Sequence, residues 1–254
     1  METEKLLNFS CELGRHLLGN GAEIYRVEES LQRLLNAYGY DQIEVFAIPA
    51  CIILNIQTGE RNYTKSVRIR SVTNNLRKLD LLNALCRDLC RETPPIEACE
   101  QRLGQILREP IYAEPVSFLA HGFVALFFAL FWGGGAADAA IAFFCGLLVK
   151  LSFGSLQRVR ANVFFTNLLT STLLALPPLL LEYAGAPIHT DKIIIGTIML
   201  LVPGIAITNV MRDVLSGDFL TALTRFAEVL IVAVGIAAGV AIAITGTRFL
   251  LGVV

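Results

Sequence analysis

The sequence has few charged residues for its length, and neither sign of charge prevails. Only 17% of its 254 residues are Asp, Glu, Lys or Arg, and the formal net charge is -1. A nucleic-acid-binding protein needs a basic surface, so this balance argues against that class. With 54% hydrophobic residues and a mean hydropathy of +0.60, the composition instead indicates a protein embedded in a lipid bilayer.

The N-terminus lacks the features of a secretory signal. Acidic residues, Gly14 and Arg15 interrupt its apolar run, and no basic segment precedes it. We therefore place the N-terminal part in the cytoplasm, where its cysteines stay reduced and are expected to be small buried thiols. Cys86 and Cys90 share a helix face, but no histidine lies near them and a structural zinc site takes four ligands, so we expect no metal.

Motifs of catalysis are also missing. The N-terminal part contains no nucleotide-binding loop and no catalytic triad. The apolar part shows neither a serine–histidine pair nor a paired-acid protease motif at helical spacing. We therefore expect that the protein is not an enzyme and needs no cofactor.

The charge is concentrated at one end of the chain. Residues 1–114 hold 14 of the 21 Lys and Arg and 16 of the 22 Asp and Glu. This split predicts a cytoplasmic domain over residues 1–112 and a membrane domain over residues 113–254.

The hydrophobic period changes twice within the first domain. Apolar residues recur at three- and four-residue spacing over 6–17 and 24–38, which predicts two amphipathic helices separated near Gly19-Asn20-Gly21. The period is two in "QIEVFAI", "CIILNIQT" and "YTKSVRIR", which predicts three short antiparallel strands. Two more helices follow, and we expect Thr93 to cap the second of them. The order of elements predicts an α+β fold.

Glu23 and Arg26 lie in the stretch "GNGAEIYRVEESL", at the start of a helix whose other face is apolar. They fit a solvated helix face with an acid near its positive end. They also fit a regulatory or gating contact with the membrane domain.

Five apolar segments follow, each close to the ~20 residues that cross a hydrocarbon core. They cover residues 116–133, 139–156, 162–181, 192–210 and 220–245. Basic residues favour the loops that are inside when the first domain is cytoplasmic, so we expect the N-terminus inside and the C-terminus outside. An odd number of spans suggests half of an inverted-repeat transporter, completed by a second chain or another copy.

The stretch from 199 to 234 combines apolar residues with a helix breaker and charges. Pro203 cannot donate a backbone hydrogen bond and Gly204 adds freedom, so we expect the fourth span to kink or unwind there. Charges inside membrane spans are candidates for function because they are costly in lipid. The alternatives are that residues 212–218 form a cytoplasmic loop whose basic residue, Arg212, sets topology, and that Arg225 extends to the interface. The polar and charged positions of this stretch are Asn209, Arg212, Asp213, Asp218, Arg225 and Glu228.

Three stretches carry a resemblance to a known family. "GNGAEIYRVEESL", "FWGGGAADAAIAFFCGLL" and "LVPGIAITNVMRDVLSGDFLTALTRFAE" resemble the N-terminal half of the threonine/serine exporters, including the split YjjP-type inner-membrane proteins. The resemblance covers nearly the whole chain. It implies a multi-pass subunit, in a bacterial inner membrane, of a secondary exporter of threonine/serine-like amino acids or small dicarboxylates such as succinate. It also implies a second small transmembrane subunit as partner.

The family motif suggests which positions line or gate the pathway. They are Pro203, Gly204, Asn209, Asp213, Gly217, Asp218 and Arg225. We expect the broken span and Asn209 to meet a substrate carboxylate, Arg225 to supply positive charge, and Asp213 or Asp218 to hold an amine or a proton. The alternative function is a membrane-anchored sensor or scaffold whose cytoplasmic domain binds a ligand.

Overall fold

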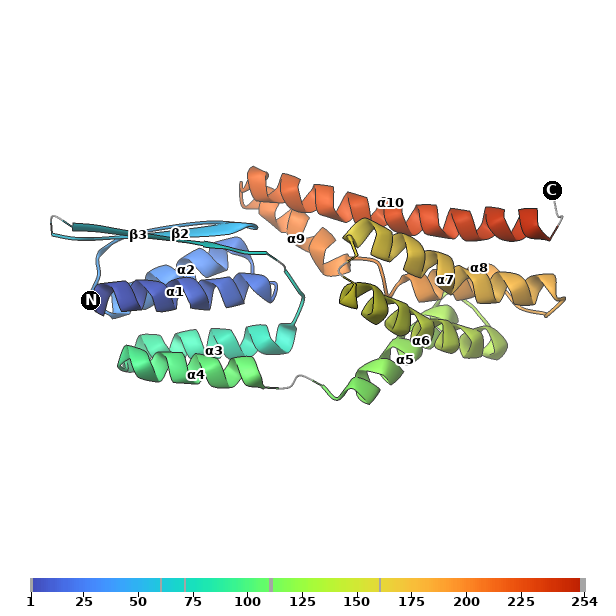
Figure 1. Ribbon diagram of the computed structural model, residues 1–254, viewed down its shortest axis with the longest axis horizontal. Coiled ribbons are helices and arrows are strands. Elements are labelled where there is room, and N and C mark those ends of the chain that lie inside the picture. The colour runs from blue at the N-terminus through green and yellow to red at the C-terminus, as the bar shows by residue number, and fades with distance from the viewer. Residues whose placement is uncertain (1, 60, 71, 110–111, 160, 252–254) are drawn as a thin grey trace. The chain divides into compact units, whose positions relative to one another are not determined.

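Contacts between Cα atoms group the chain into two compact units. Unit 1 comprises Met1–Ile111 and Asn209–Thr224, and unit 2 comprises Tyr112–Thr208 and Arg225–Val254. The computed structural model describes residues 2–59, 61–70, 72–109, 112–159 and 161–251 (Figure 1).

Unit 1 contains the α+β fold that the change of period predicts. Its elements are α1 (Glu2–Gly19), α2 (Ile24–Ala37), β1 (Gln42–Ile48), β2 (Cys51–Thr58), β3 (Arg61–Arg68), α3 (Leu76–Glu92) and α4 (Ile96–Arg108). The strands form one antiparallel sheet in the order β1-β2-β3. Val45 pairs with Leu54, and Leu54 with Lys65. Alternate residues of β2 therefore point into the core, where Leu54 is fully buried.

Three layers build unit 1: the sheet, then α1 with α2, then α3 with α4 (Figure 1). The middle layer is apolar toward both neighbours, and Leu13, Leu31 and Leu34 are completely buried in it. Each such side chain contributes about 1.5–3 kcal/mol of burial free energy. The other face of the sheet is open, with Phe46 and Ile53 exposed.

The predicted cap of the fourth helix is wrong. Thr93 ends α3 instead: its backbone is left-handed at φ 40° and its N–H donates to the Leu89 carbonyl at 3.0 Å. Pro95 is the N-cap of α4. The reason is Pro94, since the residue before a proline is disfavoured in the right-handed helical region.

Four helices in the described residues are long and apolar enough to cross a membrane. They are α5 (Glu114–Phe131), α6 (Ala136–Arg158), α7 (Val163–Tyr183) and α10 (Phe219–Leu250). The segment 192–210, expected as the fourth of five spans, is not one helix. It is divided between α8 (Thr190–Ile198) and α9 (Gly204–Leu215), because Pro203 interrupts the helix between them.

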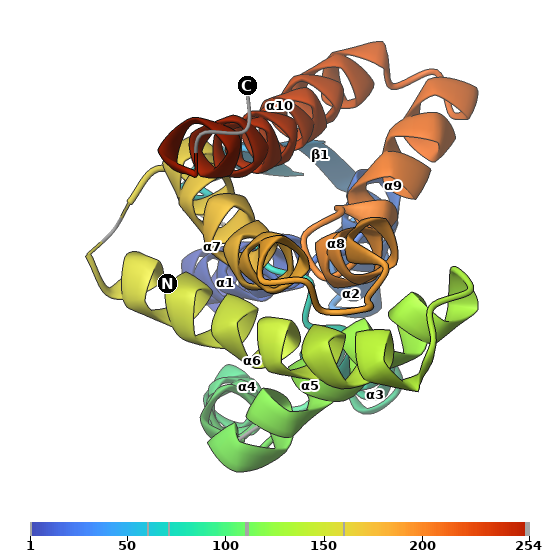
Figure 2. The same cartoon turned by 90° about the vertical axis from the view of Figure 1, so that its right-hand side faces the viewer.

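Small residues let the helices of unit 2 approach closely. In Figure 2, α8 lies against α5, α6 and α7. A Cβ atom at Gly196 of α8 would lie 2.6 Å from the backbone nitrogen of Ala129 in α5. On α10, a Cβ at Gly239 would overlap Leu168 and Ser171 of α7, and the Thr172 hydroxyl donates to the Gly239 carbonyl at 3.0 Å. Glycine at such contacts is typical of helices packed in a bilayer.

Candidate functional site

The break between α8 and α9 runs from Met199 to Pro203. The Leu200 and Leu201 amides donate to carbonyls three residues earlier, at 3.1 and 2.8 Å, which tightens the end of α8. The Gly204 amide donates to the Val202 carbonyl at 2.9 Å, and α9 starts there. Pro203 has no amide to continue the helical ladder, so the predicted interruption at Pro203-Gly204 is present. It places irregular backbone in the middle of an apolar segment.

A tight turn joins α9 to α10. Gly217 has φ 82°, its amide donates to Val214 at 3.1 Å, and the Asp218 amide donates to the Asp213 carbonyl at 2.9 Å. This pair of bonds is a Schellman motif, which requires a left-handed residue such as glycine. The Asp218 carboxylate then accepts from the Thr221 amide at 3.3 Å and caps α10. Gly217 and Asp218 thus have a structural role that accounts for their residue types.

Glu23 and Arg212 form an ion pair within unit 1. Glu23 is the N-cap of α2, and its carboxylate also lies 2.8 Å from the Arg26 guanidinium. The Glu23 side chain is only 14% exposed, whereas those of Arg26 and Arg212 are 63% and 44% exposed. A carboxylate withdrawn from water needs such partners, so this contact attaches α9 to the start of α2.

Asn209 and Asp213 lie one turn apart on α9, within the same unit. The Asn209 side chain is partly buried, and Asp213 is only 3% exposed. A carboxylate this deeply buried in a short helix is costly unless charge or hydrogen bonds compensate it. Asp213 is therefore the most deeply buried acid among the predicted site residues that the structure describes.

The remaining predicted residues belong to unit 2. Pro203 and Gly204 lie at the break, while Arg225 is partly buried and Glu228 exposed, one turn apart on α10. The structure thus brings Glu23, Arg26 and Arg212 directly together. The other predicted residues lie on the segment that runs from Pro203 through α9 and the turn into α10, which also carries Arg212.

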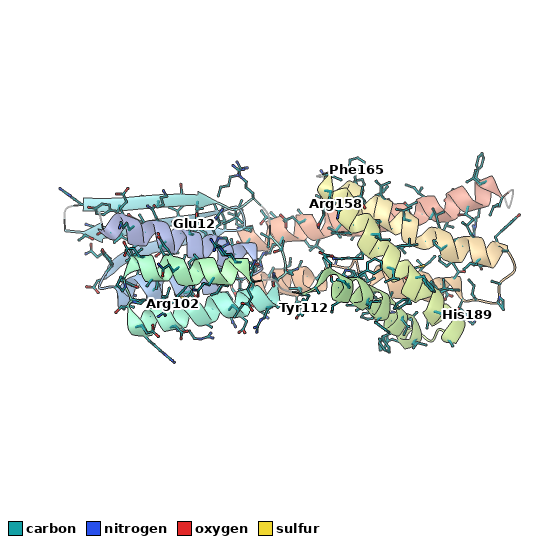
Figure 3. All side chains as sticks on the ribbon, turned by 60° about the horizontal axis from the view of Figure 1, so that its bottom comes forward. Glu12, Arg102, Tyr112, Arg158, Phe165 and His189 are labelled. Atoms are coloured by element: carbon teal, nitrogen blue, oxygen red, sulfur yellow. The ribbon has the colours of Figure 1, made fainter. Side chains whose placement is uncertain are left out.

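Sequence reasoning missed a pair at the other end of α8. The Asp138 carboxylate, with its side chain 3% exposed, accepts from the Gly135 amide at 2.7 Å, the His189 amide at 2.8 Å and the His189 Nδ1 at 2.9 Å. It therefore joins the N-termini of α6 and α8. His189 lies at the opposite end of unit 2 from Arg158 (Figure 3). Nothing in the sequence pattern indicates that His189 contacts Asp138.

Glu28 is a second residue that the sequence did not single out. Its carboxylate accepts from the Ala47 amide at 2.7 Å, which ties α2 to the end of β1. Burial raises the pKa of Glu28 above its usual value, and the charge of Asp218 raises it further, while the hydrogen bond from Ala47 acts against both. The turn between α9 and α10 therefore lies within electrostatic reach of α2.

The cysteines fit structural thiols. Burial raises the pKa of Cys86 to about 12 and that of Cys11 to about 11, and raises the pKa of Cys90 as well. A thiol with so high a pKa is a poor nucleophile and a poor metal ligand near neutral pH. Among the residues that the structure describes, no group of three or more His, Cys, Asp or Glu could hold a metal ion.

Comparison with known protein families shows to which family the chain belongs. The ThrE model, that of the threonine/serine exporters, matches residues 8–246. The chain belongs to the ThrE threonine/serine exporter family. The resemblance inferred from the three sequence stretches is thereby confirmed, and this is a family of transporters, not of enzymes.

Three relatives in the ThrE family span most of this chain. A "Threonine/serine exporter" of Corynebacterium glutamicum is 26% identical over 94% of the chain, and a "Probable threonine/serine exporter" of Mycobacterium tuberculosis is 22% identical over 97%. The chain spans about half the length of these two, 50% and 47%. The "Probable succinate transporter subunit YjjP" of Escherichia coli is 24% identical over 96% of the chain and 97% of its own length. No solved structure matches this ThrE-family chain.

Proposed function

We propose that this chain is one subunit of a secondary exporter of small polar metabolites, and that it works with a second, small transmembrane subunit. The substrates are threonine/serine-like amino acids or small dicarboxylates such as succinate. The location is a bacterial inner membrane, with residues 1–112 as cytoplasmic domain and residues 113–254 as membrane domain.

The lengths of the relatives support a two-part exporter. Two relatives named as exporters are about twice as long as this chain, whereas the one of equal length is named as a subunit. By analogy with the relative named as a subunit, residues 1–254 supply one part of the exporter, and a second membrane subunit or a further copy supplies the other.

The contacts at the two ends of the α8–α9 segment support five crossings. His189, just before α8, binds Asp138 at the start of α6, the end that follows the first hairpin loop. Arg212, near the end of α9, binds Glu23 in the α+β unit. The segment between them holds about the ~20 residues that cross a bilayer core. Counted with the four long helices, it makes five crossings, with the N-terminus inside and the C-terminus outside.

The single observation that carries the proposal is the interruption of this crossing from Met199 to Pro203. Lipid does not tolerate irregular backbone, so protein or water must meet it. In secondary transporters, such broken helices near the midplane bind substrates and coupling ions. A pure membrane anchor has no need of one.

The residues expected to line the pathway have the chemistry for a zwitterion or a dicarboxylate. The start of α9 offers backbone amides, and Asn209 offers an amide side chain, to a substrate carboxylate. Arg225 supplies positive charge and Glu228 lies one turn further along α10. Asp213 or Asp218 holds the amine of an amino acid or carries a coupling proton. Glu23 and Arg26 act as a gate contact through Arg212.

The test is efflux of labelled threonine, serine and succinate from vesicles that hold this chain alone or together with the second subunit. Efflux of one substrate class only when both are present supports the two-part exporter and identifies its substrate. No efflux of any of the three, with both proteins inserted, would favour the membrane-anchored sensor or scaffold.

A further inference from the structure

One stretch of unit 1 is basic although the domain as a whole is not. Residues 61–79, "RNYTKSVRIRSVTNNLRKL", contain six Lys and Arg and no Asp or Glu. Acids outnumber bases over residues 1–114, so this acid-free run is a local excess of positive charge. It covers β3, an edge strand, and the segment that leads into α3.

Hydrogen bonds place the second half of this run at one end of unit 1. The Thr73 amide donates to the Gly19 carbonyl at 2.8 Å, and the Asn75 amide to the Asn20 carbonyl at 3.2 Å. The Lys78 ammonium donates to the Leu107 carbonyl at 3.1 Å. The segment therefore lies beside both the turn from α1 to α2 and the C-terminal end of α4.

The same end of unit 1 is where the chain passes toward the apolar helices. Leu107 is the penultimate residue of α4, and α5, the first candidate span, begins at Glu114. Glu23, just after the α1–α2 turn, binds Arg212 near the end of α9, and α10 begins at Phe219. The basic segment thus lies next to both links to candidate membrane-spanning helices: the one from α4 to α5, and the one from Glu23 through Arg212 to α10.

The exposed side chains of the segment are of two kinds. Arg68, Arg70 and Arg77 are exposed, and so are Val72 and Leu76, at 53% and 61%. Arg77 lies 3.6 Å from Glu109, an exposed pair that neutralises only part of the charge. A stretch that exposes both basic and apolar groups suits the headgroup region of a bilayer, where phosphates meet the basic groups and the acyl boundary meets the apolar ones.

We propose that residues 68–70 and 72–78 bind anionic phospholipid headgroups of the cytoplasmic leaflet, with the arginines on phosphates and Val72 and Leu76 at the acyl boundary. Anionic lipids attract juxtamembrane basic residues within about a Debye length, ~8–10 Å at physiological salt. The contact holds the α+β unit against the bilayer. This lipid contact goes beyond the proposed transport function, because it forms and can be measured without any substrate.

The test uses the whole chain in nanodiscs of phosphatidylcholine alone and of phosphatidylcholine with phosphatidylglycerol. Hydrogen–deuterium exchange is followed in peptides that cover residues 68–78. We expect slower exchange there in the anionic nanodiscs only, and loss of this difference at high salt. Replacing Arg68, Arg70 and Arg77 by Gln removes the difference, whereas the same replacements at Arg61, Arg87 and Arg91, which are also exposed and remove the same charge, leave it.

Two results would overturn the proposal. One is equal exchange of residues 68–78 of the unsubstituted chain in both lipid compositions. The other is protection by succinate or threonine in neutral nanodiscs with none from phosphatidylglycerol, which would assign the basic segment to the substrate. Exchange of the buried α2 and β2 peptides verifies that each variant is folded. If a variant is not folded, the salt dependence of hydrogen exchange in the unsubstituted chain tests the lipid contact instead.

Discussion

Glu23 is the residue on which the contacts between α2 and α9 depend. Replacing Arg212 by Gln leaves the buried carboxylate with Arg26 alone. Because Arg212 is partly exposed, we expect a loss of about 1–2 kcal/mol in the stability of unit 1, below the 3–5 kcal/mol typical of a fully buried pair. A double-mutant cycle of Glu23→Gln and Arg212→Gln, read by thermal unfolding in detergent, measures the coupling. Arg26→Gln, at the more exposed partner, is the control and should cost less.

Glu28 gives a prediction about the pH dependence of stability, and here the substitution is expected to stabilise the protein. Burial raises its pKa above 4.5, so ionisation destabilises the folded state, and this cost is complete above the folded pKa. Glu28→Gln keeps an oxygen for the Ala47 amide and cannot ionise. We expect the variant to melt at a higher temperature than the unsubstituted protein near neutral pH, and the difference to vanish below pH 4.5. A difference that stays constant with pH would contradict this account. Glu29→Gln, on the exposed side of the same helix, is the control.

Single residues show where sequence patterns are informative and where they are not. Gly217 and Asp218 stand out in the sequence, but the structure gives them a turn and a cap, which any tight helix–helix connection requires. His189 does not stand out, because its partner Asp138 is 51 positions earlier and no period links them. Contacts between distant parts of the chain depend on helix packing, which the local sequence does not specify.

Among the elements, the α8–α9 break makes the sharpest prediction. Pro203→Ala restores the missing amide, so we expect α8 and α9 to join, with a gain of up to about 3 kcal/mol in helix stability. Efflux should fall roughly tenfold, equivalent to about 1.4 kcal/mol in the transport barrier, because the irregular backbone is lost. Efflux assays and hydrogen exchange at residues 199–204 provide the measurements.

Two prolines of α7 provide matched controls for this change. Pro177 and Pro178 lie inside a helix that continues through them. Their replacement by Ala should alter efflux far less than Pro203→Ala. Unchanged efflux in the Pro203 variant, together with slower hydrogen exchange at residues 199–204, would show that transport does not need the break.

The packing of α10 on α7 depends on one glycine. Gly239→Leu introduces atoms where Leu168 and Ser171 already lie, so α10 cannot keep its contact with α7. We expect a loss of stability of at least about 1–3 kcal/mol, as for other overpacked contacts. Thermal unfolding in detergent measures it. Gly246→Leu on the same helix, where nothing lies within 4 Å, should change little, and equal losses at both positions would contradict this packing.

The elements follow from the sequence with one exception, the helix cap next to Pro94, and the break at Pro203 is also set by a proline. The switch from period 3.6 to period 2 predicted the order of helices and strands in unit 1, because each element buries one face. The fourth span is expected to kink or unwind at Pro203 and is divided into two helices there, whereas Thr93 ends a helix instead of starting one. In both places a proline removes one backbone arrangement, and the tertiary contacts then select among those that remain.

For the whole chain, the count of crossings makes a prediction about sidedness. With five crossings, a reporter fused after residue 254 is outside when a reporter fused at the N-terminus is inside. Alkaline phosphatase and green fluorescent protein fusions at both ends measure this. A C-terminal reporter that behaves as cytoplasmic would mean that the α8–α9 segment re-enters without crossing.

The substrate and the second subunit could not be predicted in detail from the sequence, for a physical reason. Asn209 and Arg225 suit any small carboxylate, so the residue types alone do not separate an amino acid from a dicarboxylate. An interface with a second subunit would lie among apolar side chains that lipid could cover equally well. The choice between an amino acid and a dicarboxylate, and between lipid and a partner, depends on the complete assembly and not on the residue types of one chain.

The α8–α9 segment is tied at both of its ends. Asp138 and His189 fix the beginning of α8, and Glu23 fixes Arg212 near the end of α9. A rod fastened at two points and jointed between them can change its bend only if one fastening moves. Anything that immobilises Arg212 within unit 1 should therefore restrict bending at Pro203 without touching Pro203 itself.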